Sequence, residues 1–359
     1  MVTVNVELGE RSYPIYIGSD LLSTLGELCA SHSVPTHVCV ITDTNVGGLY
    51  LRQVNSILRH NGADPSSIVI SPGERQKSLT RAKAIYETLL GRQFNRSSAL
   101  VALGGGVVGD LTGYVAATFR RGIPYVQVPT TLLAQVESSI GGKVGVNLAS
   151  RKNAVGAFYQ PKFVVSDLKV LSSLPRREIV CGLGELLKYA YLHEELFTMI
   201  FHQLDRILTT DVDVIEEVLI QCNSIKAKMI SEDERELSPG GGRMVLNLGH
   251  TVGHALEVLS NYRLHHGEAV LIGLRWELLI AQEARLIGLS DFEKLDTLLS
   301  RVTYGPNVDF IPKQKLLSAI FGQHPTAKFV IPFGLGKIDA ASIDKSVVES
   351  VLKKIKAAR

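Results

Sequence analysis

The order of the apolar segments is the feature that most constrains how this chain can fold. Up to about residue 173, short runs rich in Val, Ile and Leu alternate with amphipathic stretches of helical period, such as residues 79–90. The strand-like runs occupy residues 2–8, 38–41, 67–71, 99–103, 125–128 and 163–166. Such alternation is typical of a parallel β-sheet covered by helices. We therefore predict an α/β domain over residues 1–173.

Helical patterns dominate the rest of the chain, from Leu174 and Pro175 onward. They occupy residues 177–192, 214–231, 246–259 and 268–286, and few strand signals remain. A glycine-rich loop at residues 238–242 interrupts them. We predict a second, mostly α-helical domain over residues 174–359, with the boundary near Ser173.

The composition excludes several classes of protein. With 38 Lys+Arg against 35 Asp+Glu, the chain lacks the excess of positive charge that binding to a nucleic-acid backbone requires. Hydrophobic residues make up 45% of the 359 residues, which is typical of a globular and not of a disordered chain. Glycines or charges interrupt the most apolar stretches well before the length of a membrane span. We expect a protein that binds neither nucleic acid nor membrane.

The cysteines and the N-terminus indicate the cellular compartment. The four cysteines (Cys29, Cys39, Cys181 and Cys222) are scattered, without a Cys-x-x-Cys pair. This spacing argues against a disulfide framework and against a thiolate zinc site. The N-terminus has no basic leader followed by an apolar run. We expect a cytoplasmic protein.

A glycine turn follows the apolar run at residues 99–103. Gly104, Gly106 and Gly109 have the Gly-x-Gly-x-x-Gly spacing, which lets backbone amides at a helix N-terminus approach a pyrophosphate. A tight strand-to-helix turn explains the same glycines, so the pattern leaves both interpretations open. Asp43, after an earlier strand, could bind ribose hydroxyls, although a helix cap is the simpler interpretation.

Two further segments carry polar groups suited to ligands. In the first, Gly141 and Gly142 precede Lys143, an arrangement that suits an anionic oxygen, although a solvated polar turn is the alternative. In the second, four polar residues are spaced by four, three and four, so on one continuous helix they would share a face. They are Arg243, Asn247, His250 and His254. A core helix has no packing reason for such a stripe.

Two other elements could complete a metal site with this stripe. Glu185 lies in an apolar helical stretch, where it could also pair with Lys188. His265 and His266 lie where a loop meets a helix, a place where surface histidines are common. Two imidazoles and one carboxylate, with an open position, form the ligand set of a catalytic zinc. Spacing alone does not decide which histidines coordinate.

Taken together, these motifs resemble the 3-dehydroquinate synthase family. The matching segments are residues 72–77, 104–110, 121–122, 128–133, 138–143, 152–153, 174–178, 184–188, 246–255 and 266–270. Each match is modest, but their number and order are specific, and they extend from about Asp43 to Val270. The resemblance implies a Rossmann-like, NAD-binding α/β domain, a helical metal and substrate domain, and a homodimer.

The resemblance also implies residue roles. The zinc (or cobalt) ligands would be Glu185, His250 and His266. The NAD contacts would be Asp43, Glu74, Lys77, Gly105, Gly106, Val107, Asp110, Thr130, Thr131, Lys143, Lys152, Ser173 and Glu178. The substrate contacts would be Glu137, Lys143, Asn153, Lys188, Lys226, Arg243, Asn247 and His254, together with Arg121 reaching the neighbouring subunit's phosphate site. The catalytic groups among them would be His254, Lys143, Arg243 and Asn247.

The implied reaction converts 3-deoxy-D-arabino-heptulosonate 7-phosphate, a small sugar phosphate, into 3-dehydroquinate and phosphate. It is a step of the shikimate pathway toward chorismate and the aromatic amino acids. In the reaction so implied, zinc would polarise a secondary hydroxyl so that NAD+ could accept a hydride. The ketone acidifies the adjacent C–H bond, phosphate leaves, and the hydride returns. The ring then opens, and the enol closes on the ketone in an intramolecular aldol step.

Three departures from the family pattern bear on the substrate. Glu137 stands where the family has Asp, and Val144 replaces a Thr. Residues 320–332 lack the family's Asp-Lys-Lys segment, so either Lys328 or Lys337 substitutes for its lysine or the substrate differs.

Other functions remain open. Related cyclases that make deoxyinosose or valiolone rings would share the fold, zinc and NAD, although Asn247 favours the dehydroquinate branch. A dehydrogenase of the glycerol dehydrogenase type would accumulate NADH, and it usually has Asp where this chain has Glu185. A catalytically inactive member of the family is the third alternative.

Overall fold

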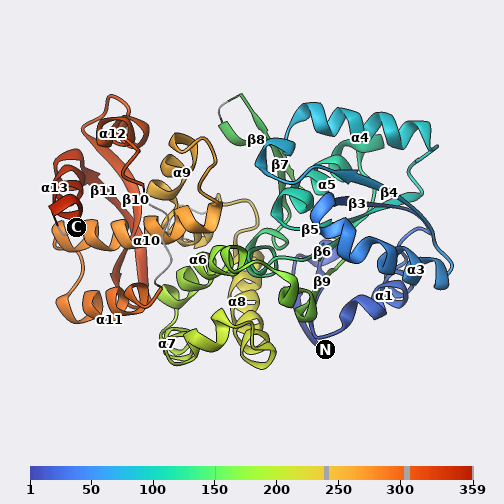
Figure 1. Cartoon of the computed structure of the whole chain (residues 1–359), viewed down its shortest axis with the longest axis horizontal. Coiled ribbons are helices and arrows are strands. Elements are labelled where there is room, and N and C mark those ends of the chain that lie inside the picture. The colour runs from blue at the N-terminus through green and yellow to red at the C-terminus, as the bar shows by residue number, and fades with distance from the viewer. Residues whose placement is uncertain (150, 238–241, 303–307, 358–359) are drawn as a thin grey trace. The chain divides into compact units, whose positions relative to one another are not determined.

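The computed structural model describes residues 1–149, 151–237, 242–302 and 308–357. By packing, the chain forms two compact units (Figure 1). The first comprises Met1–Ile179 and Thr210–Arg235, and the second comprises Val180–Thr209 and Glu236–Arg359. The domain boundary expected near Ser173 stays a prediction. Of the expected glycine-rich loop, residues 238–241 lie outside the described residues.

A seven-stranded sheet forms the centre of the first unit, in the order β1-β2-β9-β6-β5-β3-β4. All neighbouring strands are parallel except β1 and β2, which are antiparallel. The strands are β1 (Val2–Val6), β2 (Tyr13–Gly18), β3 (His37–Asp43), β4 (Asp64–Ile70), β5 (Ser98–Gly104), β6 (Tyr125–Pro129) and β9 (Val164–Asp167). The six predicted strands are confirmed, with ends shifted by a few residues.

Hydrophobic side chains on both faces explain why this sheet is buried. Along β3, Val38 and Val40 join one core cluster, while Cys39 and Ile41 join the other. Helices α1 (Leu25–Ser31) and α3 (Arg52–His60) contribute to the first cluster. Helices α4 (Leu79–Gly91) and α5 (Gly106–Thr118) contribute to the second. A strand buried on both faces reads as a continuous apolar run, as β5 does.

The first unit also contains a hairpin and a long helix. Strands β7 (Lys143–Leu148) and β8 (Arg151–Phe158) pair antiparallel, and α8 (Val212–Glu232) packs on β1 and β2. The short helical segments are η1 (Gly9–Arg11), η2 (Leu21–Thr24), α2 (Thr44–Val46), η3 (Gly47–Leu51), η4 (Glu74–Gln76), η5 (Phe119–Arg121), η6 (Ala134–Ser138) and η7 (Leu168–Ser173).

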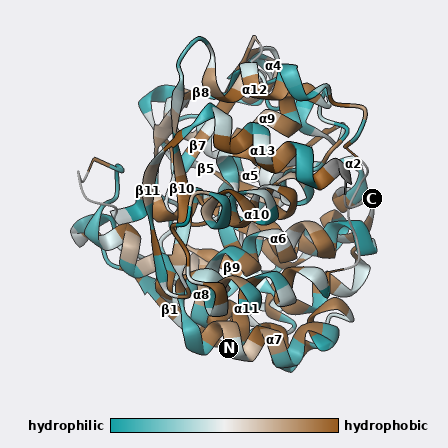
Figure 2. Ribbon diagram, turned by 90° about the vertical axis from the view of Figure 1, so that its left-hand side faces the viewer, coloured by the Kyte–Doolittle hydropathy of each residue, from teal (hydrophilic) through white to brown (hydrophobic). Residues whose placement is uncertain are grey.

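The second unit is mostly helical, as predicted, and its helices carry bands of hydrophobic and hydrophilic residues (Figure 2). Its elements are α6 (Arg176–Leu192) from Val180 onward, α7 (Glu194–Leu208), η8 (Gly242–Asn247), α9 (His250–Leu259), α10 (His266–Glu283), α11 (Leu289–Ser300), α12 (Lys313–Phe321) and α13 (Lys345–Ala357). It also contains an antiparallel hairpin of β10 (Thr326–Gly334) and β11 (Lys337–Asp344), which the patterns did not predict.

The prediction of one continuous helix over residues 246–259 is wrong. The 3-10 helix η8 ends at Asn247, and α9 begins at His250. Between them Gly249 has a φ of 79°, a left-handed conformation that ends one helix before the next begins. Arg243 and Asn247 therefore do not share a helical face with His250 and His254.

Two further properties follow from the described residues. The four cysteines are buried, and none of them forms a disulfide. Among the helices of the described chain, none combines the length and the apolar character needed to cross a bilayer.

Candidate functional site

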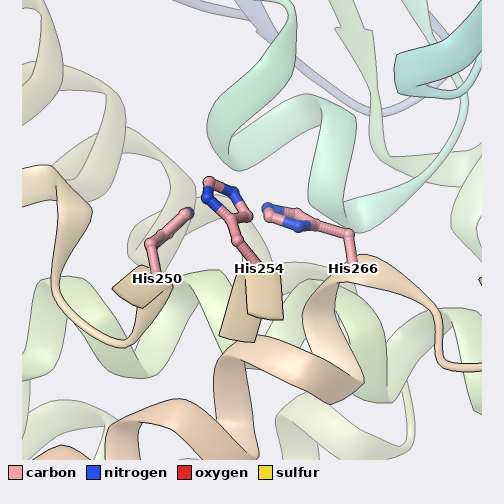
Figure 3. Close-up of side chains that lie close together, drawn as sticks. All are labelled: His250, His254 and His266. Carbon is pink, nitrogen blue, oxygen red and sulfur yellow. The ribbon is translucent and has the colours of Figure 1, made fainter. Parts of the chain in front are cut away.

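Three histidines of the second unit point toward one another (Figure 3). His250 is the first residue of α9, His254 lies one turn later, and His266 is the first residue of α10. One ring nitrogen of each lies within 4.8 Å of the others. Glu185 on α6 approaches the same point: its Oε1 lies 3.1 Å from Nε2 of His266 and 3.5 Å from Nε2 of His250. Ligand atoms on a tetrahedral zinc lie about 3.4 Å apart, so these separations fit a metal.

Hydrogen bonds orient two of the imidazoles. Nδ1 of His250 lies 2.9 Å from the carbonyl oxygen of Leu248, and Nδ1 of His266 lies 3.1 Å from Oε2 of Glu257. Since both partners are acceptors, each Nδ1 donates and each Nε2 faces Glu185. Metal-binding histidines characteristically have such a second partner, which sets the ring orientation.

Charge in this cluster is unusually concentrated. Burial alone would raise the pKa of Glu185, but Lys188 and His250 outweigh it and hold that pKa well below its ordinary value. Nζ of Lys188 lies 2.6 Å from Oε2 of Glu185, and both side chains are fully buried. Although burial lowers the pKa of His266, Glu257 and Glu185 raise it to about 9. Two carboxylates thus favour a cation at the His266 position, so the donor set fits a divalent metal.

Glycines bring the helices that carry this cluster into contact. A Cβ added at Gly184 would lie 2.4 Å from the carbonyl oxygen of Gly267, and one added at Gly267 would lie 1.9 Å from that of Cys181. Only glycine allows backbones to approach so closely. The motifs around Glu185 and His266 therefore have a packing role: they place α6 against the start of α10.

The predicted nucleotide-binding residues lie mainly at one edge of the sheet in the first unit. Asp43, Gly104 and Thr130 stand at or just after the carboxyl ends of β3, β5 and β6, which are neighbours in the sheet. Ligands of open parallel sheets bind at this edge. Gly105 caps α5, and a Cβ at Gly106 would lie 2.9 Å from Oγ of Ser138. The turn is therefore tight, and its amides lie at a helix N-terminus.

Asp43 has the structural role that the sequence favoured. Its Oδ1 accepts hydrogen bonds from the backbone amides of Asn45 (2.8 Å) and Val46 (3.0 Å), which caps α2. Thr131 acts similarly, since its Oγ1 accepts from the amide of Ala134. Neither contact tests binding to a nucleotide.

Ion pairs connect other predicted residues of this unit. Lys77 is buried and pairs with Asp110, whose pKa is raised by burial. Nζ of Lys152 lies 3.9 Å from Oε1 of Glu74, and Nζ of Lys226 lies 2.9 Å from Oε1 of Glu137.

The remaining predicted residues occupy varied positions. Ser173 accepts a hydrogen bond from the hydroxyl of Tyr50, and Glu178 lies in the first turn of α6. Arg121 is exposed with a φ of 70°, while Lys143, exposed, begins β7. Val107 is partly buried in α5. In the second unit, Arg243 is buried in η8, and Asn247 ends that segment.

Two residues that sequence reasoning missed form hydrogen bonds to segments that carry predicted site residues. Nδ2 of Asn147 donates to Oε1 of Glu74 (2.8 Å), and its Oδ1 accepts from the amide of Asn153 (2.9 Å). Glu277 on α10 is fully buried and bonds the start of α9. Each is a single polar residue within an otherwise ordinary strand or helix pattern, so no local signal marks it.

Val144, which stands where the family pattern has Thr, packs in the core against Gly113 of α5.

Comparisons with known proteins agree with the earlier resemblance. The family models for the 3-dehydroquinate synthase N-terminal and C-terminal regions match residues 67–181 and 182–323. The 3-dehydroquinate synthase of Caldanaerobacter subterraneus subsp. tengcongensis is 42% identical over 98% of this chain and 100% of its own. That of Symbiobacterium thermophilum is 45% identical over 83% and 82%.

Solved structures show the same fold. A 2-deoxy-scyllo-inosose synthase complexed with carbaglucose-6-phosphate, NAD+ and Co2+ matches with a TM-score of 0.87 and 23% identity, covering 98% of this chain and 100% of its own. The 2-epi-5-epi-valiolone synthase of Streptomyces hygroscopicus subsp. jinggangensis, with NAD+ and Zn2+ bound, matches with a TM-score of 0.86 and 22% identity, covering 100% of both. Together with the family models and the full-length relatives, these matches show that the chain belongs to the 3-dehydroquinate synthase family.

Proposed function

We propose that this chain converts 3-deoxy-D-arabino-heptulosonate 7-phosphate into 3-dehydroquinate and phosphate, using NAD+ and a divalent metal. The observation that carries the proposal is the convergence of Glu185, His250 and His266 in a chain that the family models match over residues 67–323. We keep residues 1–173 as the NAD domain and 174–359 as the metal and substrate domain. A homodimer in the cytoplasm completes the proposal.

Glu185, His250 and His266 are the proposed metal ligands. An alternative set replaces Glu185 by His254, whose ring nitrogen lies near the other two. The carboxylate is favoured because its Oε1 faces both Nε2 atoms at 3.1 and 3.5 Å, whereas His254 is exposed. The chemistry that the bound groups supply is polarisation of a substrate hydroxyl by the metal and reversible acceptance of a hydride by NAD+.

The first unit provides the proposed NAD contacts. The amides of Gly105 and Gly106, at the N-terminus of α5, suit the pyrophosphate. Asp43, at the end of the neighbouring strand β3, suits a ribose. The other proposed contacts are Glu74, Lys77, Val107, Asp110, Thr130, Thr131, Lys143, Lys152, Ser173 and Glu178.

Cations hold the anionic substrate in this proposal. Lys226 and Arg243 are each only 2% exposed, so little water would screen their charges from a phosphate or a carboxylate, although Lys226 also pairs with Glu137. Asn247 and His254 orient the reacting hydroxyls. The other proposed contacts are Glu137, Lys143, Asn153, Lys188 and, from the neighbouring subunit, Arg121.

One assay tests the reaction. Phosphate release from the heptulosonate phosphate is measured with NAD+ and Zn2+ supplied, while NADH absorbance is followed in the same cuvette. We expect phosphate without lasting NADH, because the hydride returns in each cycle. NADH without phosphate would indicate a polyol dehydrogenase. The absence of both phosphate and NADH would contradict the proposal. It would point to another sugar phosphate as substrate or to an inactive protein.

A pair of variants tests the ligand assignment. We expect Glu185→Ala to lose stoichiometric zinc, because a carboxylate ligand is removed from a buried site. His254→Ala should keep its zinc and turn over slowly. Zinc content is measured by elemental analysis of the purified proteins. If His254→Ala loses its zinc while Glu185→Ala keeps it, His254 and not Glu185 is the third metal ligand.

A further inference from the structure

A buried carboxyl group, that of Glu277 on α10, caps the N-terminus of α9, the helix that carries His250. Oε2 of Glu277 accepts a hydrogen bond from the amide of Gly249 (2.5 Å), and its Oε1 accepts from the amide of Val252 (3.1 Å). The first amides of a helix have no partner within the helix and are normally capped by a nearby side chain. Gly249, at the cap position of α9, has no side chain, so the cap comes from α10.

The two helices are shaped to receive this contact. Gly273 lies one turn before Glu277 on α10, and a Cβ there would lie 1.9 Å from the carbonyl oxygen of Gly249. Similarly, a Cβ at Gly253 would lie 3.1 Å from the carbonyl oxygen of Ala269. Glycines thus let the first turn of α9 rest on the backbone of α10, with the Glu277 carboxylate at its end.

The two amides that donate to Glu277 belong to Gly249 and Val252, which lie on either side of His250 in the sequence. The ring of His250 also depends on this turn, because its Nδ1 bonds the carbonyl oxygen of Leu248. The direction of Nε2 toward Glu185 is therefore set by the conformation of residues 248–252. A small movement of this turn would separate two atoms that now lie 3.5 Å apart.

Packing alone does not account for a carboxylate here. Glu277 is fully buried, and removing a carboxyl group from water costs stability whether or not it is ionised. An apolar residue would fill the same volume without that cost, but it would leave the amides of Gly249 and Val252 without this acceptor.

We infer that Glu277 is a positioning residue for the proposed metal site, acting through its two hydrogen bonds to the first turn of α9. The inference rests on the proposed function, in that His250 is taken as a metal ligand. In this role Glu277 acts on the backbone amides of Gly249 and Val252, and not on a ligand side chain or the substrate. It holds the backbone from which His250 projects.

Cobalt binding to the metal-free protein tests the inference without an activity assay. The variant is Glu277→Gln, which keeps the size of the side chain but replaces one acceptor oxygen by a donor. We expect the Kd for Co2+ to rise about tenfold or more and the visible absorption bands of the bound Co2+ to shift. Affinity is measured by competition with a chelating dye.

A matched control distinguishes positioning from stability. Asp167 in the first unit is also a buried carboxylate that accepts backbone hydrogen bonds, from the amides of Asp20, Leu22 and Lys169. Asp167→Asn should lower the thermal unfolding midpoint but leave the Kd and the Co2+ spectrum unchanged. A Glu277→Gln protein that is less stable but has the wild-type Kd and spectrum would overturn the inference.

A second variant covers the case in which Glu277→Gln does not fold. Glu277→Asp keeps the carboxyl group but is one methylene shorter, so it cannot reach both amides, and we expect a smaller rise in the Kd. A wild-type Kd in Glu277→Asp would overturn the inference. Failure of the proposed function looks different: the wild-type protein would bind Co2+ normally yet release no phosphate.

Discussion

The contact between α6 and α10 gives a sharp prediction for Gly267→Ala. The added Cβ would lie 1.9 Å from the carbonyl oxygen of Cys181 and 2.4 Å from its carbonyl carbon. Because both obstructing atoms are backbone, no side-chain rotation relieves the clash. The helices must separate by about 1.5 Å to restore ordinary contact. Overpacking of this kind costs about 3 kcal/mol, the upper part of the usual range.

The same movement should weaken the proposed metal site. His266 is next to Gly267, and its Nε2 lies 3.1 Å from Oε1 of Glu185. An added separation of about 1.5 Å would exceed the spacing of about 3.4 Å that two ligands of one tetrahedral zinc require. We expect the Kd for zinc to rise at least about tenfold.

Thermal unfolding with and without zinc, together with zinc competition titrations, measures both effects. For a unit of the size of the second one, we expect the unfolding midpoint to fall by about 6–12 °C. Gly288→Ala is the matched control in the same unit, because a Cβ there meets nothing within 4 Å. A Gly267→Ala protein with the midpoint and zinc affinity of this control would refute the packing argument.

Three further predictions follow from the geometry. Glu257→Gln weakens the partner of Nδ1 of His266, so zinc affinity should fall about tenfold in a competition titration, with little change in NAD+ affinity. The pKa of Glu277 is raised from 4.5 to about 8 on folding, so its contribution to stability is lost as pH rises through that window. Urea unfolding of the metal-free protein should show this decline, and Glu277→Gln should show a flatter profile. Lys328 and Lys337 are both exposed, and if one replaces the missing family lysine, its Ala variant should raise the substrate KM several-fold while the other leaves it unchanged.

The α/β arrangement could be predicted because its signals are local. Strands buried on both faces appear as continuous apolar runs, and glycine marks the turn from β5 to α5. The hairpin of β10 and β11 was missed because its strands are partly exposed and mix polar with apolar residues. The helix break at Gly249 was missed because the apolar period continues on both sides of it.

Some features of the candidate site could likewise be predicted from the sequence, and others could not. Histidine, carboxylate and glycine motifs along the chain indicated a metal site, since these residue types have few other reasons to recur in apolar helices. They did not indicate that Glu257 orients His266, or that Asn147 links Glu74 to Asn153. Each of these contacts depends on where a side chain distant in sequence lies.

The sequence by itself therefore determined the order of the elements, the membership in a family, and the residue types available for chemistry. These depend on periodicity and composition, which are properties of neighbouring residues. Only the tertiary structure decided which nitrogen of His250 and His266 faces Glu185, and that Glu277 closes the helix on which His250 stands. Those outcomes depend on how closely two helix backbones approach, and that distance is set by packing between segments far apart in the chain.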